Sequence, residues 1–157
     1  MSTSRLDGGA TIDTQVIISP DPAATESAGA ALAGSLERGG VIGLVGELGA
    51  GKTVFVRGAV RELGGDPDEV RSPTFTLMNA YQCSMTVRHF DLYRLHEGSD
   101  LEGIGFQDFA RDDGLTLVEW ADRFAEVADE VDVWVHIEFI DGGDGRKITI
   151  RRSGWDS

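Results

Sequence analysis

Apolar residues recur at every fourth position in the first quarter of the chain, at Ala24, Ala28, Leu32 and Leu36. This spacing places them on one face of a helix. Asp21 precedes the pattern as a possible N-cap, and Pro22 occupies the first helical position, where proline is tolerated. Gly39 and Gly40 follow the pattern and end it. The sequence therefore predicts an amphipathic helix between about residues 22 and 38.

The strands are marked by short runs of apolar or β-branched residues, at 15–19, 41–45, 74–82, 86–92, 115–118, 133–140 and 147–151. Polar or glycine-rich turns separate the third run from the fourth and the sixth from the seventh, which predicts two antiparallel hairpins. Helical stretches are expected at 52–63 and 106–111. The pattern predicts one α/β domain whose mixed parallel and antiparallel sheet is flanked by helices.

The length of 157 residues suits a single domain with its own core. The sequence predicts a disordered tail at 1–14, a domain at 15–152 and a short C-terminal tail at 153–157. No apolar run is long enough to cross a bilayer, and the first residues lack the layout of a signal peptide. We therefore expect a cytoplasmic protein without a membrane anchor.

The charge is strongly acidic, since 27 acidic residues against 14 basic ones give a net charge of −13. Such a surface repels phosphate backbones, so tight direct binding of tRNA or another nucleic acid is not expected. A role in a nucleic-acid pathway would then require docking on a more basic protein, although solubility alone also explains the charge. Cys83 is the single cysteine, which excludes an internal disulfide. His89, His96 and His136 lack the spacing of metal ligands.

One octapeptide carries the candidate chemistry: Gly46, Glu47, Leu48, Gly49, Ala50, Gly51, Lys52 and Thr53. It fits the phosphate-binding P-loop pattern G-x-x-x-x-G-K-[ST], and it lies between an apolar run and a predicted helix, as a P-loop must. Its backbone N–H groups and the helix N-terminus would hold phosphate oxygens. Lys52 would reach the β- and γ-phosphates, and Thr53 would ligate Mg²⁺. The alternative is a glycine-rich turn that binds nothing.

A P-loop site needs a second acidic group near the metal, and two carboxylates are candidates. Glu119 follows the buried-type run 115–118, so it would emerge at the carboxyl edge of the sheet, where ligands bind in such folds. Asp91 lies within 89–94, a run too polar for an ordinary core strand. Either carboxylate could instead simply face solvent.

At these motifs the chain resembles the TsaE (YjeE) family of ATPases, which take part in threonylcarbamoyl modification of tRNA. Besides the P-loop, the resemblance rests on residues 72–77 (Ser-Pro-Thr-Phe-Thr-Leu), 89–95 (His-Phe-Asp-Leu-Tyr-Arg-Leu) and 117–120 (Leu-Val-Glu-Trp). It extends from about residue 20 to 151 and leaves out 1–14. Ala121 stands where the family has proline, which does not affect the acidic ligand.

The resemblance implies that Lys52 and the loop amides hold the phosphates of ATP, and that Thr53 and Glu119 hold Mg²⁺. It implies that Asp91 assists hydrolysis by orienting the attacking water or through the water shell of the metal.

The resemblance also implies roles at the margins of the site. Thr74, in the switch-like loop 72–74, would contact the γ-phosphate. Trp120 would lie beside the nucleotide, although a core aromatic is the alternative. Arg146 would approach the adenine, although it could equally be a solvated arginine of the hairpin.

The function expected from the resemblance is an accessory ATPase that acts with TsaD- and TsaB-type proteins. The first alternative is a small-molecule P-loop kinase, but no arginine-rich lid segment is found to clamp a transferred phosphoryl group. The second is a GTPase switch, but the chain lacks the Asn-Lys-x-Asp tetrapeptide that reads guanine.

Overall fold

The structure is a computed structural model. It describes the chain except residues 1, 6–9, 74–76, 96–100, 102, 104, 141–142 and 156–157, and at 2–5, 10–13 and 153–155 it describes the backbone only.

Within the described residues, eight strands form one sheet in the order β1-β2-β8-β7-β3-β6-β5-β4. The strands are β1 (Ser2–Arg5), β2 (Ala10–Ser19), β3 (Gly39–Val45), β4 (Met78–Gln82), β5 (Thr86–Asp91), β6 (Gly114–Glu119), β7 (Val133–Phe139) and β8 (Arg146–Trp155). The central strands β7, β3, β6 and β5 run parallel, and the pairs toward both edges are antiparallel. This confirms the predicted mixed sheet.

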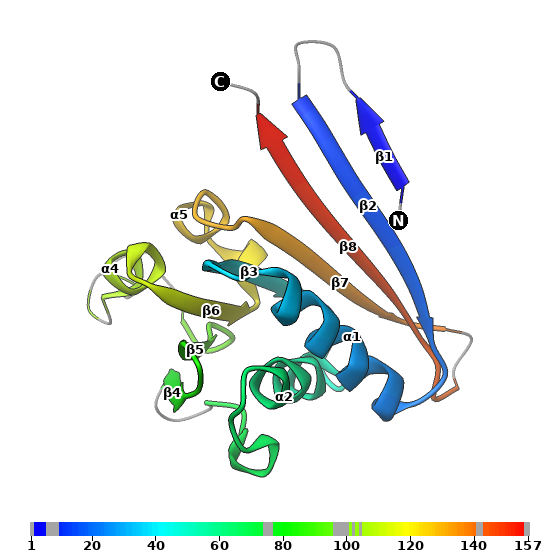
Figure 1. The fold of residues 1–157 in the computed structure, drawn as a ribbon, viewed down its shortest axis with the longest axis horizontal. Coiled ribbons are helices and arrows are strands. Elements are labelled where there is room, and N and C mark those ends of the chain that lie inside the picture. Colours follow the sequence, from blue (N-terminus) through cyan, green and yellow to red (C-terminus); the bar gives the residue numbers. More distant parts are fainter. Residues whose placement is uncertain are drawn as a thin grey trace.

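Helices cover both faces of the central strands. They are α1 (Pro22–Ser35), α2 (Lys52–Glu62), α4 (Phe106–Arg111) and α5 (Ala125–Ala128), with short 3₁₀ turns η1 (Pro67–Glu69) and η2 (Ala121–Arg123). Figure 1 shows α1 and α2 together on one side of β3 and β6, and α4 and α5 on the other. The predicted start of the first helix is confirmed, because the Asp21 carboxylate accepts from the Ala24 N–H at 2.9 Å.

The core has two parts, one on each face of the sheet. Leu115 and Leu117 of β6 pack beneath α1 and α2, whereas Val118 packs with Phe106 of α4 on the opposite face. Alternation of side chains along a strand explains this division. Strand β6 is thus buried on both faces, as a central parallel strand should be.

Helices α1 and α2 approach each other backbone to backbone. A Cβ at Gly29 would lie 2.0 Å from the Phe55 carbonyl oxygen, and one at Gly58 would lie 1.8 Å from that of Glu26. Only glycine fits at such contacts. This packing fixes the direction of α2 and therefore the placement of the loop that enters it.

The outer strands are longer than the apolar pattern predicted. Within 1–14, where a disordered tail was expected, the backbone forms β1 and the first half of β2, and β2 pairs with β8 from Ala10↔Trp155 to Ser19↔Arg146. Main-chain hydrogen bonds hold these ends together, and such bonds need no apolar side chains, so the pattern missed them. The division of the chain into tails and a domain at 15–152 stays a prediction.

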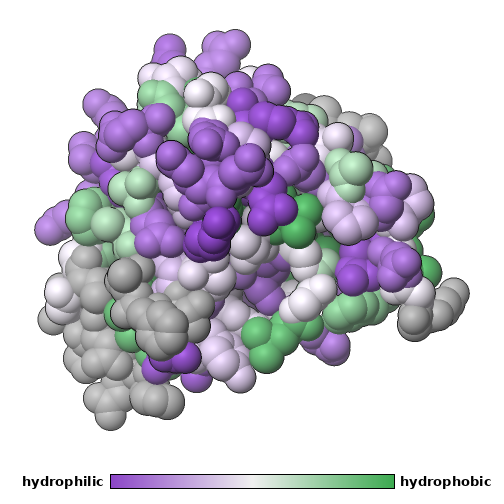
Figure 2. All heavy atoms as spheres, turned by 90° about the horizontal axis from the view of Figure 1, so that it is seen from below, coloured by the Kyte–Doolittle hydropathy of each residue, from purple (hydrophilic) through white to green (hydrophobic). Residues whose placement is uncertain are grey.

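Hydrophilic residues cover most of the face seen in Figure 2, and the apolar residues there form small separate groups. In the part of the chain that the structure describes, no helix is long and apolar enough to cross a membrane.

Candidate functional site

The P-loop joins the carboxyl end of β3 to the first turn of α2. Gly49 and Gly51 have φ angles of +80° and +115°, in the left-handed region that favours glycine. A Cβ at Gly46 would lie 2.6 Å from the carbonyl oxygen of Ile137 on β7, so this position also requires glycine. The backbone geometry therefore requires glycine at both fixed glycine positions of the motif, Gly46 and Gly51, which argues against an arbitrary glycine-rich turn.

The Lys52 side chain is folded into the loop. It is 5% exposed, and its Nζ donates to the carbonyl oxygens of Gly46 and, at 3.1 Å, Glu47. The ammonium also lies 4.1 Å from the centre of the Trp120 ring. Burial lowers the pKa of Lys52, while the nearby carboxylates, Glu119 first, oppose that shift. A cation held by carbonyls and an aromatic face can transfer its donors to an incoming anion.

Glu119 and Thr53 meet beside Lys52, as the sequence predicted. Strand β6 lies parallel to β3 with Leu44 opposite Glu119, which brings the end of β6 to the mouth of the loop. The Thr53 hydroxyl donates to Glu119 Oε2 at 3.3 Å. Hydroxyl and carboxylate oxygens are hard ligands that suit Mg²⁺. The two residues fit a metal that takes its remaining ligands from phosphates and water.

Among the residues with described side chains, no three His, Cys, Asp or Glu groups gather as a metal cage. Mg²⁺ is usually held by one or two carboxylates together with substrate phosphates, so a pair such as Thr53 and Glu119 is the donor set it requires.

Asp91 lies at the end of β5, opposite Glu119 in the strand register. Its carboxylate accepts from the Ser72 hydroxyl and from the Tyr93 N–H, each at 3.0 Å. Asp91 and Glu119 therefore lie side by side at the carboxyl ends of the adjacent strands β5 and β6.

These residues line a single cavity of about 270 Å³, together with Leu48, Gly49, Gly51, Lys52, Thr53, Val54, Ser72 and Trp120. The structure thus brings together most of the predicted site residues. Thr74 lies outside the described residues, and its contact with a γ-phosphate stays a prediction.

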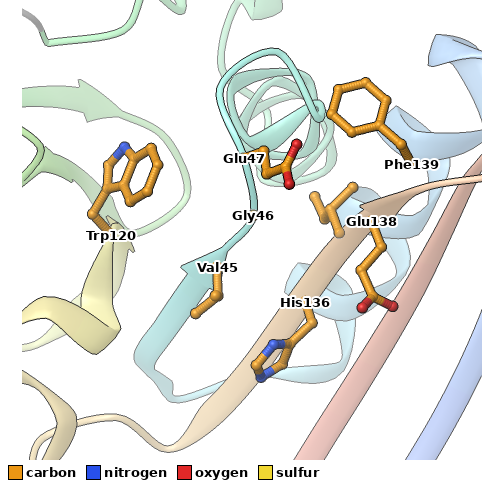
Figure 3. A pocket seen from close by; sticks show the side chains of 8 residues that line it. Val45, Gly46, Glu47, Trp120, His136, Glu138 and Phe139 are labelled. Carbon is orange, nitrogen blue, oxygen red and sulfur yellow. The ribbon is translucent and has the colours of Figure 1, made fainter. Parts of the chain in front are cut away.

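Trp120 forms a wall between this cavity and a larger one of about 520 Å³. Figure 3 shows the larger pocket with Trp120 at one end, Phe139 and Glu138 at the other, and Glu47 of the loop between them. Trp120 has a φ of 63°, unusual for a bulky residue, and its N–H donates to the Leu44 carbonyl at 3.0 Å. This turn places the indole beside Lys52, and the ring also packs against the part of the core that contains Val118 and Phe106.

Arg146, at the start of β8, donates hydrogen bonds to two backbone carbonyls of the P-loop. Its Nε donates to the Ala50 carbonyl at 2.9 Å and its Nη2 to the Gly49 carbonyl at 3.5 Å. The guanidinium also lies 4.3 Å from the centre of the Phe139 ring. Arg146 is therefore not a freely solvated hairpin arginine. Its approach to an adenine stays a prediction.

Two contacts of the site escaped the sequence analysis. The P-loop contacts of Arg146 join residues about 100 positions apart, and no local pattern signals them. The contact of His89 with Glu119 had one visible signal, a histidine in the middle of a strand, where a buried ring nitrogen needs a hydrogen-bond partner.

A family model described as "Threonylcarbamoyl adenosine biosynthesis protein TsaE" matches residues 19–148. The chain is also similar to the structure titled as that of Bacillus subtilis YdiB, with a TM-score of 0.68 and 26% identity. That match covers 91% of this chain and 88% of the other.

Proteins named tRNA threonylcarbamoyladenosine biosynthesis protein TsaE are similar over most of the chain. The Treponema pallidum protein is 39% identical over 73% of this chain and 84% of its own. The Haemophilus influenzae protein is 36% identical over 73% and 71%. The Bacillus subtilis protein is 33% identical over 85% and 83%. The motifs at the P-loop, β5 and β6 and the similarity along the chain agree: the chain belongs to the TsaE family of tRNA threonylcarbamoyladenosine biosynthesis.

Proposed function

We propose that this protein binds ATP with Mg²⁺ at the P-loop and hydrolyses it as an accessory of the tRNA-modifying complex, acting with TsaD- and TsaB-type proteins in the cytoplasm. The observation that carries the proposal is the single cavity in which Lys52, Thr53, Glu119 and Asp91 meet at the first turn of α2.

The phosphates would be held by the loop and Lys52. The N-terminus of a helix favours anions, because its first N–H groups have no partner within the helix. Lys52 at present donates to the carbonyl oxygens of Gly46 and Glu47, and a β- or γ-phosphate oxygen would offer the ammonium a full opposite charge. Binding would therefore exchange two neutral acceptors for charged ones.

Thr53 and Glu119 would hold the metal ion. When bound, Mg²⁺ neutralises charge on the phosphates as the leaving group departs. The Glu119 carboxylate is 4% exposed, so its charge acts on the cavity with little screening by solvent. Asp91 would orient the attacking water, because its carboxylate faces the same cavity and is held by Ser72 and Tyr93.

A small-molecule kinase is the alternative, and the scarcity of basic side chains in the cavity argues against it. Among the described residues that line it, Lys52 is the one basic side chain. Phosphoryl transfer to an acceptor is usually assisted by further cationic clamps. Incubation with ATP and metabolite pools separates the two functions, since a kinase yields a phosphorylated acceptor and an ATPase yields only phosphate.

The function is tested by measuring ATP affinity and hydrolysis with and without TsaD- and TsaB-type proteins. We expect slow hydrolysis by the isolated chain and faster hydrolysis in the complex. A partner that prefers the ATP-bound form must also tighten ATP binding by the same factor. Unchanged affinity and hydrolysis, together with tight binding of tRNA alone at physiological salt, would contradict the proposal.

Asp91→Asn is expected to retain nucleotide affinity but to slow hydrolysis in the complex by about 10²-fold, the usual cost of misplacing a reacting group. The amide matches the carboxylate in size and can still bond to the Tyr93 N–H and the Ser72 hydroxyl. Calorimetry and phosphate release measure the two quantities separately. Equal losses of affinity and turnover would make Asp91 a binding residue instead.

A further inference from the structure

His89 is buried against the predicted metal ligand. It lies on β5, it is 0% exposed, and its Nε2 is 2.5 Å from Glu119 Oε2. Its partner in the strand register is Leu117, whose side chain packs beneath α1 and α2. His89 therefore points to the face of the sheet that carries the P-loop.

The surroundings of the two ring nitrogens of His89 indicate which of them donates a hydrogen bond. Nδ1 is buried and has no hydrogen-bond partner among the described residues, whereas Nε2 contacts a carboxylate. A carboxylate accepts, so Nε2 carries the proton and donates. His89 is thus assigned as a hydrogen-bond donor, through Nε2–H, to the Glu119 carboxylate.

The same carboxylate oxygen accepts twice. Glu119 Oε2 accepts a hydrogen bond from His89 Nε2–H and another, at 3.3 Å, from the Thr53 hydroxyl. A glutamate has three rotatable bonds, so a lone hydroxyl on a flexible carboxylate fixes its direction weakly. A donor on a buried ring has one orientation available and fixes the carboxylate before the metal arrives.

We propose that His89 is a positioning residue, which holds the Glu119 carboxylate beside Thr53 in the orientation that Mg²⁺ requires. This inference rests on the proposed Mg²⁺-dependent nucleotide binding. Hydrogen-bonded partners of metal ligands typically alter metal affinity by about 10- to 100-fold, so the effect should be measurable without turnover.

Three variants test the role. His89→Leu removes the donor and replaces the ring with an apolar side chain of similar size. His89→Gln places an amide N–H at about the reach of Nε2, whereas His89→Asn is one methylene shorter and does not reach Glu119. The probe is Mg²⁺ alone, titrated in calorimetry into the complex of each variant with a non-hydrolysable ATP analogue. Nucleotide affinity in EDTA is measured in parallel.

We expect His89→Leu and His89→Asn to weaken Mg²⁺ binding about 10- to 100-fold, with nucleotide affinity in EDTA unchanged, and His89→Gln to recover most of the loss. If the role of His89 were purely structural, the variants would lose thermal stability, and Mg²⁺ affinity would not recover selectively in His89→Gln. If His89→Leu does not fold, the comparison of Gln with Asn decides. Equal Mg²⁺ affinities in those two variants, or wild-type affinity in His89→Leu, would overturn the inference. Failure of the wild-type chain to bind nucleotide or Mg²⁺ would instead refute the proposed function itself.

Discussion

Lys52→Ala is expected to weaken ATP binding by about two orders of magnitude. Removing one member of a buried charge pair costs about 2–5 kcal/mol, and each 1.4 kcal/mol corresponds to about a factor of ten in affinity. The Lys52 ammonium is 5% exposed and carries the positive charge within the loop, so water cannot replace it well. Calorimetric titration with ATP and Mg²⁺ measures the loss.

The chain offers a matched control for this variant. Lys147 is its other lysine, and it lies exposed on β8. Lys147→Ala removes the same charge from the protein and should leave ATP affinity near the wild-type value. Similar losses in both variants would point to net charge as the cause, and near-normal affinity in Lys52→Ala would refute the P-loop as the binding site.

Glu119→Gln is expected to remove most of the gain in nucleotide affinity that Mg²⁺ provides, about tenfold or more, while affinity in EDTA changes little. The amide retains the size of the side chain and an oxygen that can accept from Thr53 and His89, but it lacks the charge that binds a hard cation. The measurement compares nucleotide affinity with Mg²⁺ and with EDTA.

The control for Glu119→Gln is Glu37→Gln, at an exposed carboxylate after α1. It should leave the Mg²⁺ effect intact. A wild-type Mg²⁺ effect in Glu119→Gln would transfer the ligand role to Asp91, its neighbour across the strands.

The position of the P-loop and its acidic partner could be predicted because both follow from local rules. A motif between an apolar run and a helix fixes where Lys52 lies. An acidic residue after a buried parallel strand emerges at the same edge of the sheet. The 3.3 Å contact of Thr53 with Glu119 confirms that these two rules converge on one place.

Other features required the structure, because they join distant segments. The hydrogen bonds from Arg146 to the carbonyls of Gly49 and Ala50 depend on the antiparallel pairing of β8 with β7. The left-handed φ of Trp120, which turns its indole toward Lys52, has no signature in residue type. The extension of β2 to Ala10 rests on main-chain pairing, to which the pattern of apolar side chains is insensitive.

The most direct test of the central claim is a crystal structure of the wild-type chain with Mg²⁺ and a non-hydrolysable ATP analogue. We expect the terminal phosphates at the first turn of α2, with Lys52 Nζ moved from the carbonyls of Gly46 and Glu47 to the phosphate oxygens. Mg²⁺ should lie between the phosphates and the side chains of Thr53 and Glu119. A nucleotide whose phosphates lie in the pocket between Trp120 and Phe139, with Lys52 still bonded to Gly46, would contradict the account.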